Sequence, residues 1–313
     1  MKVLVTGGAG FIGSNLIKEL LIDKSVHVRV LDDLSSGSLD NLGEVSKKIE
    51  FIKGYVIDVD TVKNACSNID VIFHLAAKIS VEDSIKNPLS TNSVNIGGTL
   101  NILSSARDNK VKRVVFSSSA AVYGSINPVP IKETATVGPD SPYALQKYFG
   151  EKYCHYFSQY YGMDAVCLRY FNVYGPNQQE SGGYAGVIYK FIKNSLNGET
   201  INIEGDGEQT RDFVFVGDIV KANITAFRSS LTFNGNVYNI GTGKETSIKQ
   251  LYNVIKGLSN STVAVIHSEQ RLGDIKRSCA NIELAKAELG HISEVSLQQG
   301  LQKTIEWIRG SKE

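Results

Sequence analysis

Short runs of Val, Ile and Leu alternate along the first half of the chain with longer segments whose apolar residues recur at helical spacing. This alternation predicts repeated strand–helix–strand units, which form a parallel sheet covered by helices on both faces. The pattern predicts six strands, at 2–6, 27–32, 49–53, 70–75, 112–117 and 163–169, and helices between them at 11–22, 60–66, 88–108 and 142–161. We therefore expect an α/β fold with a doubly wound parallel sheet.

The rhythm changes after about residue 172. Glycines, acidic residues and short mixed segments follow, and the last amphipathic pattern predicts a helix near 296–309. We expect one domain over 1–172 and a second, smaller α/β domain over 173–313, with the chain free to cross back between them.

The composition excludes several classes of protein. With 33 basic and 32 acidic residues, the chain has no broad positive field for nucleic acid or an anionic membrane surface. No segment approaches 18 uninterrupted apolar residues, so we expect no membrane partner and a cytoplasmic protein. Four cysteines show no metal-ligand spacing, so no metal is expected, and they suit free buried thiols in a reducing compartment: Cys66, Cys154, Cys167 and Cys279.

A glycine-rich turn, TGGAGFIG, joins the first predicted strand to the first predicted helix. Gly7, Gly10 and Gly13 leave the backbone free to approach a pyrophosphate, and the helix amino terminus offers unpaired N–H groups. Asp32 ends the second predicted strand, 19 residues after Gly13, where a carboxylate binds ribose hydroxyls and repels a 2′-phosphate. The context predicts a Rossmann site for NAD rather than NADP; a glycine turn with a surface aspartate is the alternative.

Further residues stand at the carboxyl ends of predicted strands, where open α/β sheets bind their ligands. Asp58 and Val59 follow the third strand, and the sequence HLAA at 74–77 closes the fourth. Taken alone these are ordinary loop and core residues. We expect His74 to be a buried structural histidine with its hydrogen bonds satisfied.

The spacing Tyr-x-x-x-Lys occurs four times, at 143/147, 148/152, 189/193 and 252/256. Because any helix places residues i and i+4 on one face, the spacing alone discriminates nothing. Ser141 and Pro142 predict the N-cap and first position of a helix, which would seat Tyr143 in the first turn, where the helix dipole favours a phenolate. Tyr148 is about 140° farther around the helix and faces elsewhere.

A tyrosine that acts as a base near neutral pH needs a pKa about three units below 10, which is about 4 kcal/mol of phenolate stabilisation. Lys147, the helix terminus and a nicotinamide cation could supply it together. Ser119 ends the fifth predicted strand, with a hydroxyl free to bond a reacting alcohol oxygen. Turn chemistry equally explains the neighbouring Ser117 and Ser118.

Taken in order, the segments TGGAGFIGSNL, LDDLSSG, HLAA, FSSSAAVYG, SPYALQK, LRYFNVYGPNQ, RDFVFVGDIV and RLGD cover most of the chain. They resemble the extended short-chain dehydrogenase/reductase superfamily and, within it, the UDP-glucose 4-epimerases. The resemblance implies a tightly held NAD that is reduced and reoxidised within one turnover, so that the net reaction is isomerisation of a UDP-hexose. It implies that Tyr143 takes the proton of the sugar 4-hydroxyl, that Ser119 shares the hydrogen-bond network, and that Lys147 binds the nicotinamide ribose.

The resemblance also implies binding residues. Contacts to NAD map onto Gly7, Gly10, Phe11, Ile12, Gly13, Asp32, Asp33, Asp58, Val59, Leu75, Ala76, Ala77, Asn95, Ser117, Tyr143, Lys147 and Tyr170. Contacts to the substrate, in the second domain and beside the catalytic residues, map onto Ser119, Tyr143, Asn172, Tyr184, Val187, Arg211, Arg271, Asp274 and Ser278. The two arginines suit a diphosphate, whose oxygens match the guanidinium fork.

A homodimer through the helices at 88–108 and 142–161 is a further implication of the resemblance. The second helix carries an aromatic stripe at Phe149, Tyr153, Tyr156 and Tyr160, which without the resemblance would be assigned to core.

Some positions depart from the family pattern. Related dehydratases resemble this chain but have Thr-Asp-Glu where it has Ser119, Ala120 and Ala121, so acid–base dehydration lacks an agent. Glu204 replaces an aromatic residue that stacks on uracil in many relatives, and Lys78 replaces a neutral residue after HLAA. Ser278 is small where the family uses bulk to limit the sugar's C2 substituent, so we expect N-acetylated sugars to be accepted too. A dehydrogenase, a dehydratase and a non-catalytic binding protein are the alternatives.

Overall fold

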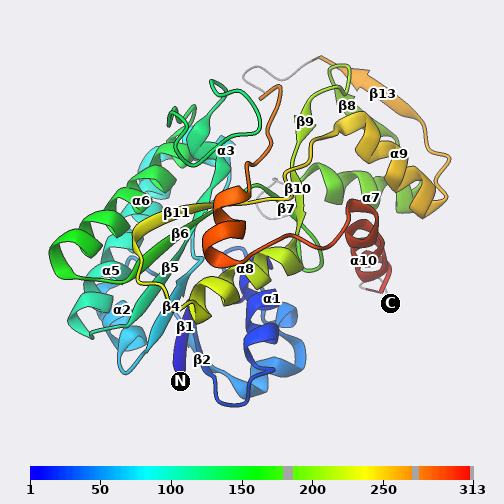
Figure 1. Ribbon diagram of the computed structural model, residues 1–313. Helices are drawn as coiled ribbons and strands as arrows, with labels where there is room; N and C mark the ends of the chain where they lie inside the picture. Colours follow the sequence, from blue (N-terminus) through cyan, green and yellow to red (C-terminus); the bar gives the residue numbers. More distant parts are fainter. Residues whose placement is uncertain (179–185, 270–274, 311–313) are drawn as a thin grey trace.

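The computed structural model describes residues 1–178, 186–269 and 275–310. Seven parallel strands form one sheet in the order β3–β2–β1–β4–β5–β6–β11 (Figure 1). The order runs outward from β1 in both directions, which is the doubly wound topology that the sequence predicts. The strands are β1 Lys2–Thr6, β2 His27–Asp32, β3 Glu50–Lys53, β4 Val71–His74, β5 Arg113–Ser119, β6 Ala165–Tyr170 and β11 Asn234–Ile240.

The prediction of six strands is wrong by one. All six exist with ends shifted by at most two residues, but β11 from the second half of the chain pairs in parallel with β6. Its segment, NGNVYNI, is rich in asparagine, and Gly235 has a φ of +77° where a side chain would collide with the backbone of His155. Such a strand lacks the apolar run on which the prediction depended. The chain therefore returns to the large sheet after residue 172, and the division into two domains at that point stays a prediction.

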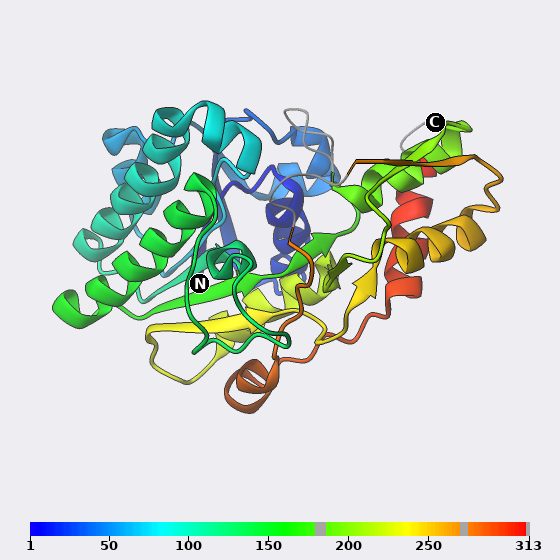
Figure 2. The same ribbon diagram turned by 90° about the horizontal axis from the view of Figure 1, so that it is seen from above.

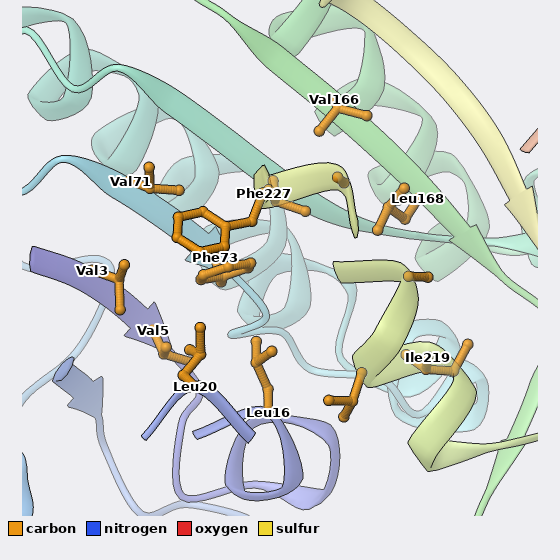
Figure 3. Close-up of a cluster of buried hydrophobic side chains, with 14 of the residues drawn as sticks. Val3, Val5, Leu16, Leu20, Val71, Phe73, Val166, Leu168, Ile219 and Phe227 are labelled. Carbon is orange, nitrogen blue, oxygen red and sulfur yellow. The ribbon is translucent and has the colours of Figure 1, made fainter. Parts of the chain in front are cut away.

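Helices cover both faces of the sheet. On one face lie α1 (Phe11–Leu20) and α8 (Val216–Arg228), and Figure 3 shows Leu16 and Phe227 of these helices packed over Val5 and Phe73. Leu4, between two residues of that cluster, joins the core on the opposite face, as the two-residue period of a strand requires. That face is covered by α2 (Val59–Cys66), α5 (Thr99–Asp108) and α6 (Pro142–Tyr161). All four cysteines are buried free thiols, as predicted.

The predicted helix over 88–108 is a helical segment in three parts: α4 (Pro88–Asn92), a π-helical turn η3 (Ser93–Gly98) and α5. At Gly98 a Cβ atom would lie 2.5 Å from a methyl of Val56, so the bare backbone allows close packing there. The turn places Asn95 beside the loop after β4. Its Oδ1 accepts the backbone N–H of Lys78 at 2.8 Å and its Nδ2 donates to the Lys78 carbonyl at 2.9 Å, so α4–α5 hold that loop.

Arg113, at the start of β5, ties the sheet to α8. Its guanidinium is buried, pairs with Asp164 at 2.8 Å, and donates to the carbonyls of Ala226, Phe227 and Ser229 at the end of α8. The last carbonyls of a helix have no partner within the helix, and a cation there also complements the helix dipole. Arg113 therefore acts as the carboxyl-terminal cap of α8.

The second half also builds a smaller unit to one side of the large sheet (Figure 2). Its apolar core gathers side chains from three helices, α7, α9 and α10, and from short two-stranded sheets. No helix in the described ranges has the length and apolar character needed to cross a membrane. The remaining elements are α3 Val81–Lys86, α7 Val187–Asn197, α9 Ile248–Ser259, α10 Leu297–Gly310, the strands β7 Asn172–Tyr174, β8 Ile201–Glu204, β9 Thr210–Arg211, β10 Phe213–Phe215, β12 Thr246–Ser247 and β13 Val265–Ser268, and the short helical turns η1 Leu39–Asn41, η2 Gly43–Lys48, η4 Ala120–Tyr123 and η5 Ala285–Leu289.

Candidate active site

A cavity of about 1200 Å³ lies at the carboxyl ends of β1, β2, β4, β5 and β6. Residues of the second half, from Asn172 onward, form part of its wall. This volume exceeds the range of roughly 300–1,000 Å³ for a single small ligand, so the cavity has room for a dinucleotide and a second ligand. The predicted site residues that line it are Gly7, Gly10, Phe11, Ile12, Gly13, Asp32, Asp33, Leu75, Ala76, Ala77, Ser117, Ser119, Tyr143, Lys147, Tyr170, Asn172, Arg211 and Ser278.

The glycine-rich turn forms one wall of the cavity. Gly7 has a φ of +69°, and a Cβ there would lie 2.8 Å from the backbone nitrogen of Ala76. A Cβ on Gly13 would overlap the carbonyl oxygen of Gly7, so only glycine lets the first turn of α1 close against β1. No side chain caps the amino terminus of α1, which leaves its first N–H groups for a phosphate. This arrangement fits the pyrophosphate of a dinucleotide.

Asp32 lies at the carboxyl end of β2 and is buried. Its Oδ2 accepts the backbone N–H of Ala9 and its Oδ1 that of Leu34, both at 2.8 Å. Burial raises the pKa of the carboxyl group, which these two hydrogen bonds oppose. Each carboxylate oxygen has a further lone pair, so the group fits the hydroxyls of a ribose.

Tyr143 and Lys147 enter the cavity from the start of α6. The Oγ of Ser141 accepts the backbone N–H of Ala144 at 3.2 Å and Pro142 occupies the first turn, which confirms the predicted helix start. The ammonium of Lys147 is buried and donates to the Ser117 carbonyl at 2.7 Å. Burial lowers the pKa of Lys147 to about 8, against the opposing charge of a carboxylate on the next turn.

The second Tyr-x-x-x-Lys pair of α6 lies away from the cavity. The ammonium of Lys152 lies 5.1 Å from the ring centroid of Tyr148, and neither residue lines the cavity. The helix start, and not the spacing, therefore distinguishes the first pair.

Ser119 ends β5 within the cavity wall. Its Oγ accepts the backbone N–H of Ala121 at 3.2 Å, a bond that uses a lone pair and not the hydroxyl proton. Ala120 and Ala121 follow it and also line the cavity, so two methyl groups stand next to the serine. The wall offers a hydroxyl donor here and no carboxylate from these two positions.

His74 is structural, as expected. The hydroxyl of Thr99 donates to the Asn95 carbonyl, so it accepts from Nε2 of His74 at 2.9 Å, and Nδ1 in turn accepts from the hydroxyl of Thr6 at 2.8 Å. Burial, and then the charge of the neighbouring Lys147, lower the pKa of the imidazole to about 3. The ring is therefore neutral and holds β4 against β1, where Thr6 also receives the backbone N–H of Ala76.

Four described residues that the sequence assigned to the site do not line the cavity. The carboxylate of Asp58 caps α2 by accepting two backbone N–H groups, and Val59 is the first residue of that helix. Asn95 holds the loop after β4 from behind, and Val187 opens α7 next to Gly186, which does line the cavity. Tyr184, Arg271 and Asp274 lie outside the described residues.

The wall of the second half contains Asn172, Arg211 and Ser278. The Nη1 of Arg211 donates to the carbonyl of Thr210 at 2.8 Å and to that of Ile275 at 2.5 Å, which fixes the guanidinium beside the cavity. Glu204, at the end of β8, does not line the cavity.

In the segment that follows β4, the sequence singled out Lys78 as a residue that could approach the cofactor, but not the residues after it. Lys78 lines the cavity and its ammonium donates to the hydroxyl of Ser90 at 2.8 Å. Ile79, Val81 and Glu82 line the cavity as well. Their position directly after a strand end was the available signal, because the crevice of a doubly wound sheet lies there.

Comparison with known proteins gives the family. The model of the NAD-dependent epimerase/dehydratase family matches residues 3–241. The chain belongs to this family. It is 41% identical over 317 residues to a UDP-glucose 4-epimerase of Mycolicibacterium smegmatis, which covers 100% of both chains.

Two solved structures have nearly the same fold. The UDP-glucose 4-epimerase of Thermotoga maritima with UDP-glucose has a TM-score of 0.94 at 38% identity and covers 100% of both chains. The UDP-N-acetylglucosamine 4-epimerase of Methanobrevibacter ruminantium, in complex with UDP-N-acetylmuramic acid, has a TM-score of 0.94 at 40% identity, over 99% of this chain and 98% of the other. The predicted membership of the extended short-chain dehydrogenase/reductase superfamily is confirmed, and the family description names NAD as the cofactor on which its members depend.

Proposed function

We propose that this protein is a UDP-hexose 4-epimerase that interconverts UDP-glucose and UDP-galactose with a bound NAD. The observation that carries the proposal is that Ser119, Tyr143 and Lys147 line one cavity together with the glycine-rich turn and Asp32. Relatives named for this reaction share the whole length of the chain. A single cavity for the cofactor and the sugar is what an internal oxidation and reduction requires.

The residues of the chain have distinct tasks in this reaction. Bound NAD supplies the hydride acceptor and donor, so that the sugar C4 is oxidised to a ketone and then reduced on its other face. Tyr143 takes the proton of the 4-hydroxyl and later returns it, while Ser119 donates its hydroxyl proton to the same oxygen. Lys147 stabilises the phenolate of Tyr143 by its positive charge, which acts strongly because the ammonium is buried.

Dehydration of the sugar is an alternative reaction that we favour less for this chain. Removal of water from the sugar needs a general acid and a general base beside the ketone. Ala120 and Ala121 supply neither at the cavity wall next to Ser119.

The test is to incubate the purified protein with UDP-galactose and no added NAD, and to follow the formation of UDP-glucose. We expect epimerisation without accumulation of free NADH, because each turnover restores the cofactor. Tyr143→Phe should lower kcat by about 10²–10⁴ while the protein still holds NAD. Tyr148→Phe, on the same helix but outside the cavity, is the matched control. Full activity in Tyr143→Phe would refute the assignment.

The substrate range is a second part of the proposal. Ser278 lines the cavity, and its small side chain leaves room for an N-acetyl group at C2. The relative from Methanobrevibacter ruminantium is named for the N-acetylated sugar. We expect the wild-type enzyme to epimerise UDP-N-acetylglucosamine. Ser278→Tyr should lower the rate with UDP-N-acetylglucosamine more than the rate with UDP-glucose. Wild-type enzyme that epimerises UDP-glucose but gives no product from UDP-N-acetylglucosamine would contradict this extension.

We also propose a homodimer that packs α4–α5 and α6 of two copies together. Large apolar side chains are exposed on these helices, among them Leu89 (84%), Phe149 (43%) and Tyr160 (71%). Large apolar side chains exposed on neighbouring helices are one sign of a protein–protein interface. Light scattering should give about twice the monomer mass, and Phe149→Glu should halve it, whereas Ile126→Glu, at an exposed apolar residue outside these helices, should not. A wild-type monomer at micromolar concentration would refute the dimer.

A further inference from the structure

Glu151 is a buried carboxylate on α6 to which the reaction above gives no task. It lies one helical turn beyond Lys147 and two beyond Tyr143, so the three side chains share one face of the helix. Its side chain is 3% exposed, and that of its ion-pair partner Arg169 on β6 is 4% exposed. Burying such a pair costs several kcal/mol of desolvation per ion, so its place beside the site calls for a reason beyond stability.

The contacts of Glu151 connect it to β5, the strand that ends at Ser119. The hydroxyl of Ser118 donates to Oε1 of Glu151 at 2.5 Å, and the ammonium of Lys147 donates to the Ser117 carbonyl at 2.7 Å. Two successive turns of α6 are thus bonded to two successive residues of β5. Ser119 is the next residue of the strand.

Close approach of the helix makes these bonds possible. A Cβ on Gly150 would collide with the ring of Phe116 on β5, so the bare backbone of α6 rests on that ring. The ammonium of Lys147 lies 5.2 Å from the centroid of the same ring. A larger residue at 150 would push the helix away and lengthen both bonds.

Arg169 holds the carboxylate of Glu151 in place beside β5. Its Nε and Nη2 donate to the two carboxylate oxygens at 2.8 and 2.7 Å, and Arg169 is the register partner of Ser118 across β5 and β6. The guanidinium is itself held 4.6 Å above the ring of Tyr123. Of the described groups around Lys147, His74 on β4 is neutral, and Glu151 is the charged group that raises the pKa of Lys147 against the effect of burial.

We propose that Glu151 is a positioning residue, which locks α6 onto the end of β5 through Ser118 and balances the charge of Lys147. The lock holds Tyr143 and Lys147 in register with Ser119. An error of about 1 Å in such a register is enough to cost roughly 10²-fold in rate. The kinetic part of this inference rests on the proposed epimerase function, whereas the lock itself does not.

The experiment compares Ser118→Ala and Glu151→Gln with Ser158→Ala. Ser158 is a matched control, because it is a buried serine of α6 whose hydroxyl bonds only within the helix, to the carbonyl of Cys154. We expect kcat for UDP-galactose to fall about 10-fold in Ser118→Ala and about 10- to 100-fold in Glu151→Gln, with KM within about 2-fold of wild type. Glu151→Gln should also move the alkaline limb of the pH profile to lower pH by at least about half a unit, since Lys147 loses its balancing charge.

Amide hydrogen exchange provides a readout that needs no substrate. The end of β5 and the first two turns of α6 should exchange at least about 10-fold faster in Ser118→Ala and Glu151→Gln than in Ser158→Ala. An inactive wild type would refute the epimerase proposal and leave the lock to be decided by exchange. If Glu151→Gln fails to fold, Ser118→Ala decides alone. Wild-type kcat and exchange in folded Ser118→Ala would overturn the inference.

Discussion

Replacing Arg113 by methionine tests how the two halves of the chain are joined. Methionine keeps the length of the side chain and much of its apolar stem, and removes the guanidinium that pairs with Asp164 and caps α8. The substitution therefore isolates the charge and its hydrogen bonds from packing. Arg113 does not line the cavity, so the variant should bind and convert substrate as the wild type does at temperatures where it is folded.

The expected loss follows from the contacts. Asp164 is left without its ion-pair partner, and the carbonyls of Ala226, Phe227, Ser229 and Leu231 lose their donor. Breaking a buried ion pair by removing one partner costs about 3–5 kcal/mol of unfolding free energy. With an unfolding entropy of about 2.1 cal/mol/K per residue over 313 residues, a loss of about 4 kcal/mol lowers Tm by about 6 °C.

Urea denaturation and thermal melts of the purified variants measure both quantities. Arg107→Met is the matched control, because Arg107 is more exposed and pairs with its neighbour Asp108 on the surface. We expect that control to change the unfolding free energy by less than about 1 kcal/mol. If Arg113→Met loses no more than Arg107→Met, the capping role assigned to Arg113 is wrong.

Three further predictions concern the site and its surroundings. The pKa of Lys147, lowered to about 8 by burial, should appear as an alkaline limb near pH 8 in the pH profile of kcat/KM, since the ammonium that supports Tyr143 is lost there; a limb above pH 10 would contradict this. Gly13→Ala should remove bound NAD, measured by release on denaturation, because its Cβ would overlap the Gly7 carbonyl, and an unchanged NAD content would refute the close-packing argument. Burial, and then the charge of Lys221, lower the pKa of His291 to about 4 in the folded protein, whereas the unfolded chain takes up this proton below about pH 6.5. The free energy of unfolding should therefore fall by about 2 kcal/mol between pH 7.5 and pH 5, and His291→Leu should flatten this dependence in urea titrations.

The large sheet could be predicted because its strands are buried on both faces and therefore read as continuous apolar runs. β11 could not be predicted, because a strand at the edge of the sheet does not need a continuous apolar run. Its Asn239, for example, is a polar residue whose side chain accepts from the Tyr123 hydroxyl and donates to loop carbonyls. The π-helical turn at Ser93–Gly98 was not predicted either, and its Gly98 packs closely against Val56, a residue far away in sequence.

The candidate site was predictable where a residue's task depends on local geometry. Ser141 and Pro142 predicted the start of α6, and with it the place of Tyr143 in the first turn, because the residues that cap a helix are adjacent in sequence. Asp58 shows the limit of this reasoning: its carboxylate caps α2 and does not line the cavity, and the cofactor contact inferred from its place after a strand stays a prediction. The partners of Glu151 come from β5 and β6, so no local pattern could have revealed them.

We expect stability and catalysis to depend on opposite ends of a single strand, β5. At its start Arg113 joins the sheet to α8. Near its end the Ser117 carbonyl accepts the ammonium of Lys147, and the Ser118 hydroxyl donates to the carboxylate of Glu151 on α6. The two ends are six residues apart, about 20 Å in an extended strand, and the strand between them is held on both sides by β4 and β6. A rigid central strand should not transmit a local rearrangement over that length, so Arg113→Met should lower stability and leave kcat unchanged, whereas Ser118→Ala should lower kcat and loosen the end of β5 and the first turns of α6 without weakening the cap of α8. If Arg113→Met lowered both stability and kcat, β5 would have to transmit strain from one end to the other, and the register of Ser119 would depend on the cap of α8 as well as on α6.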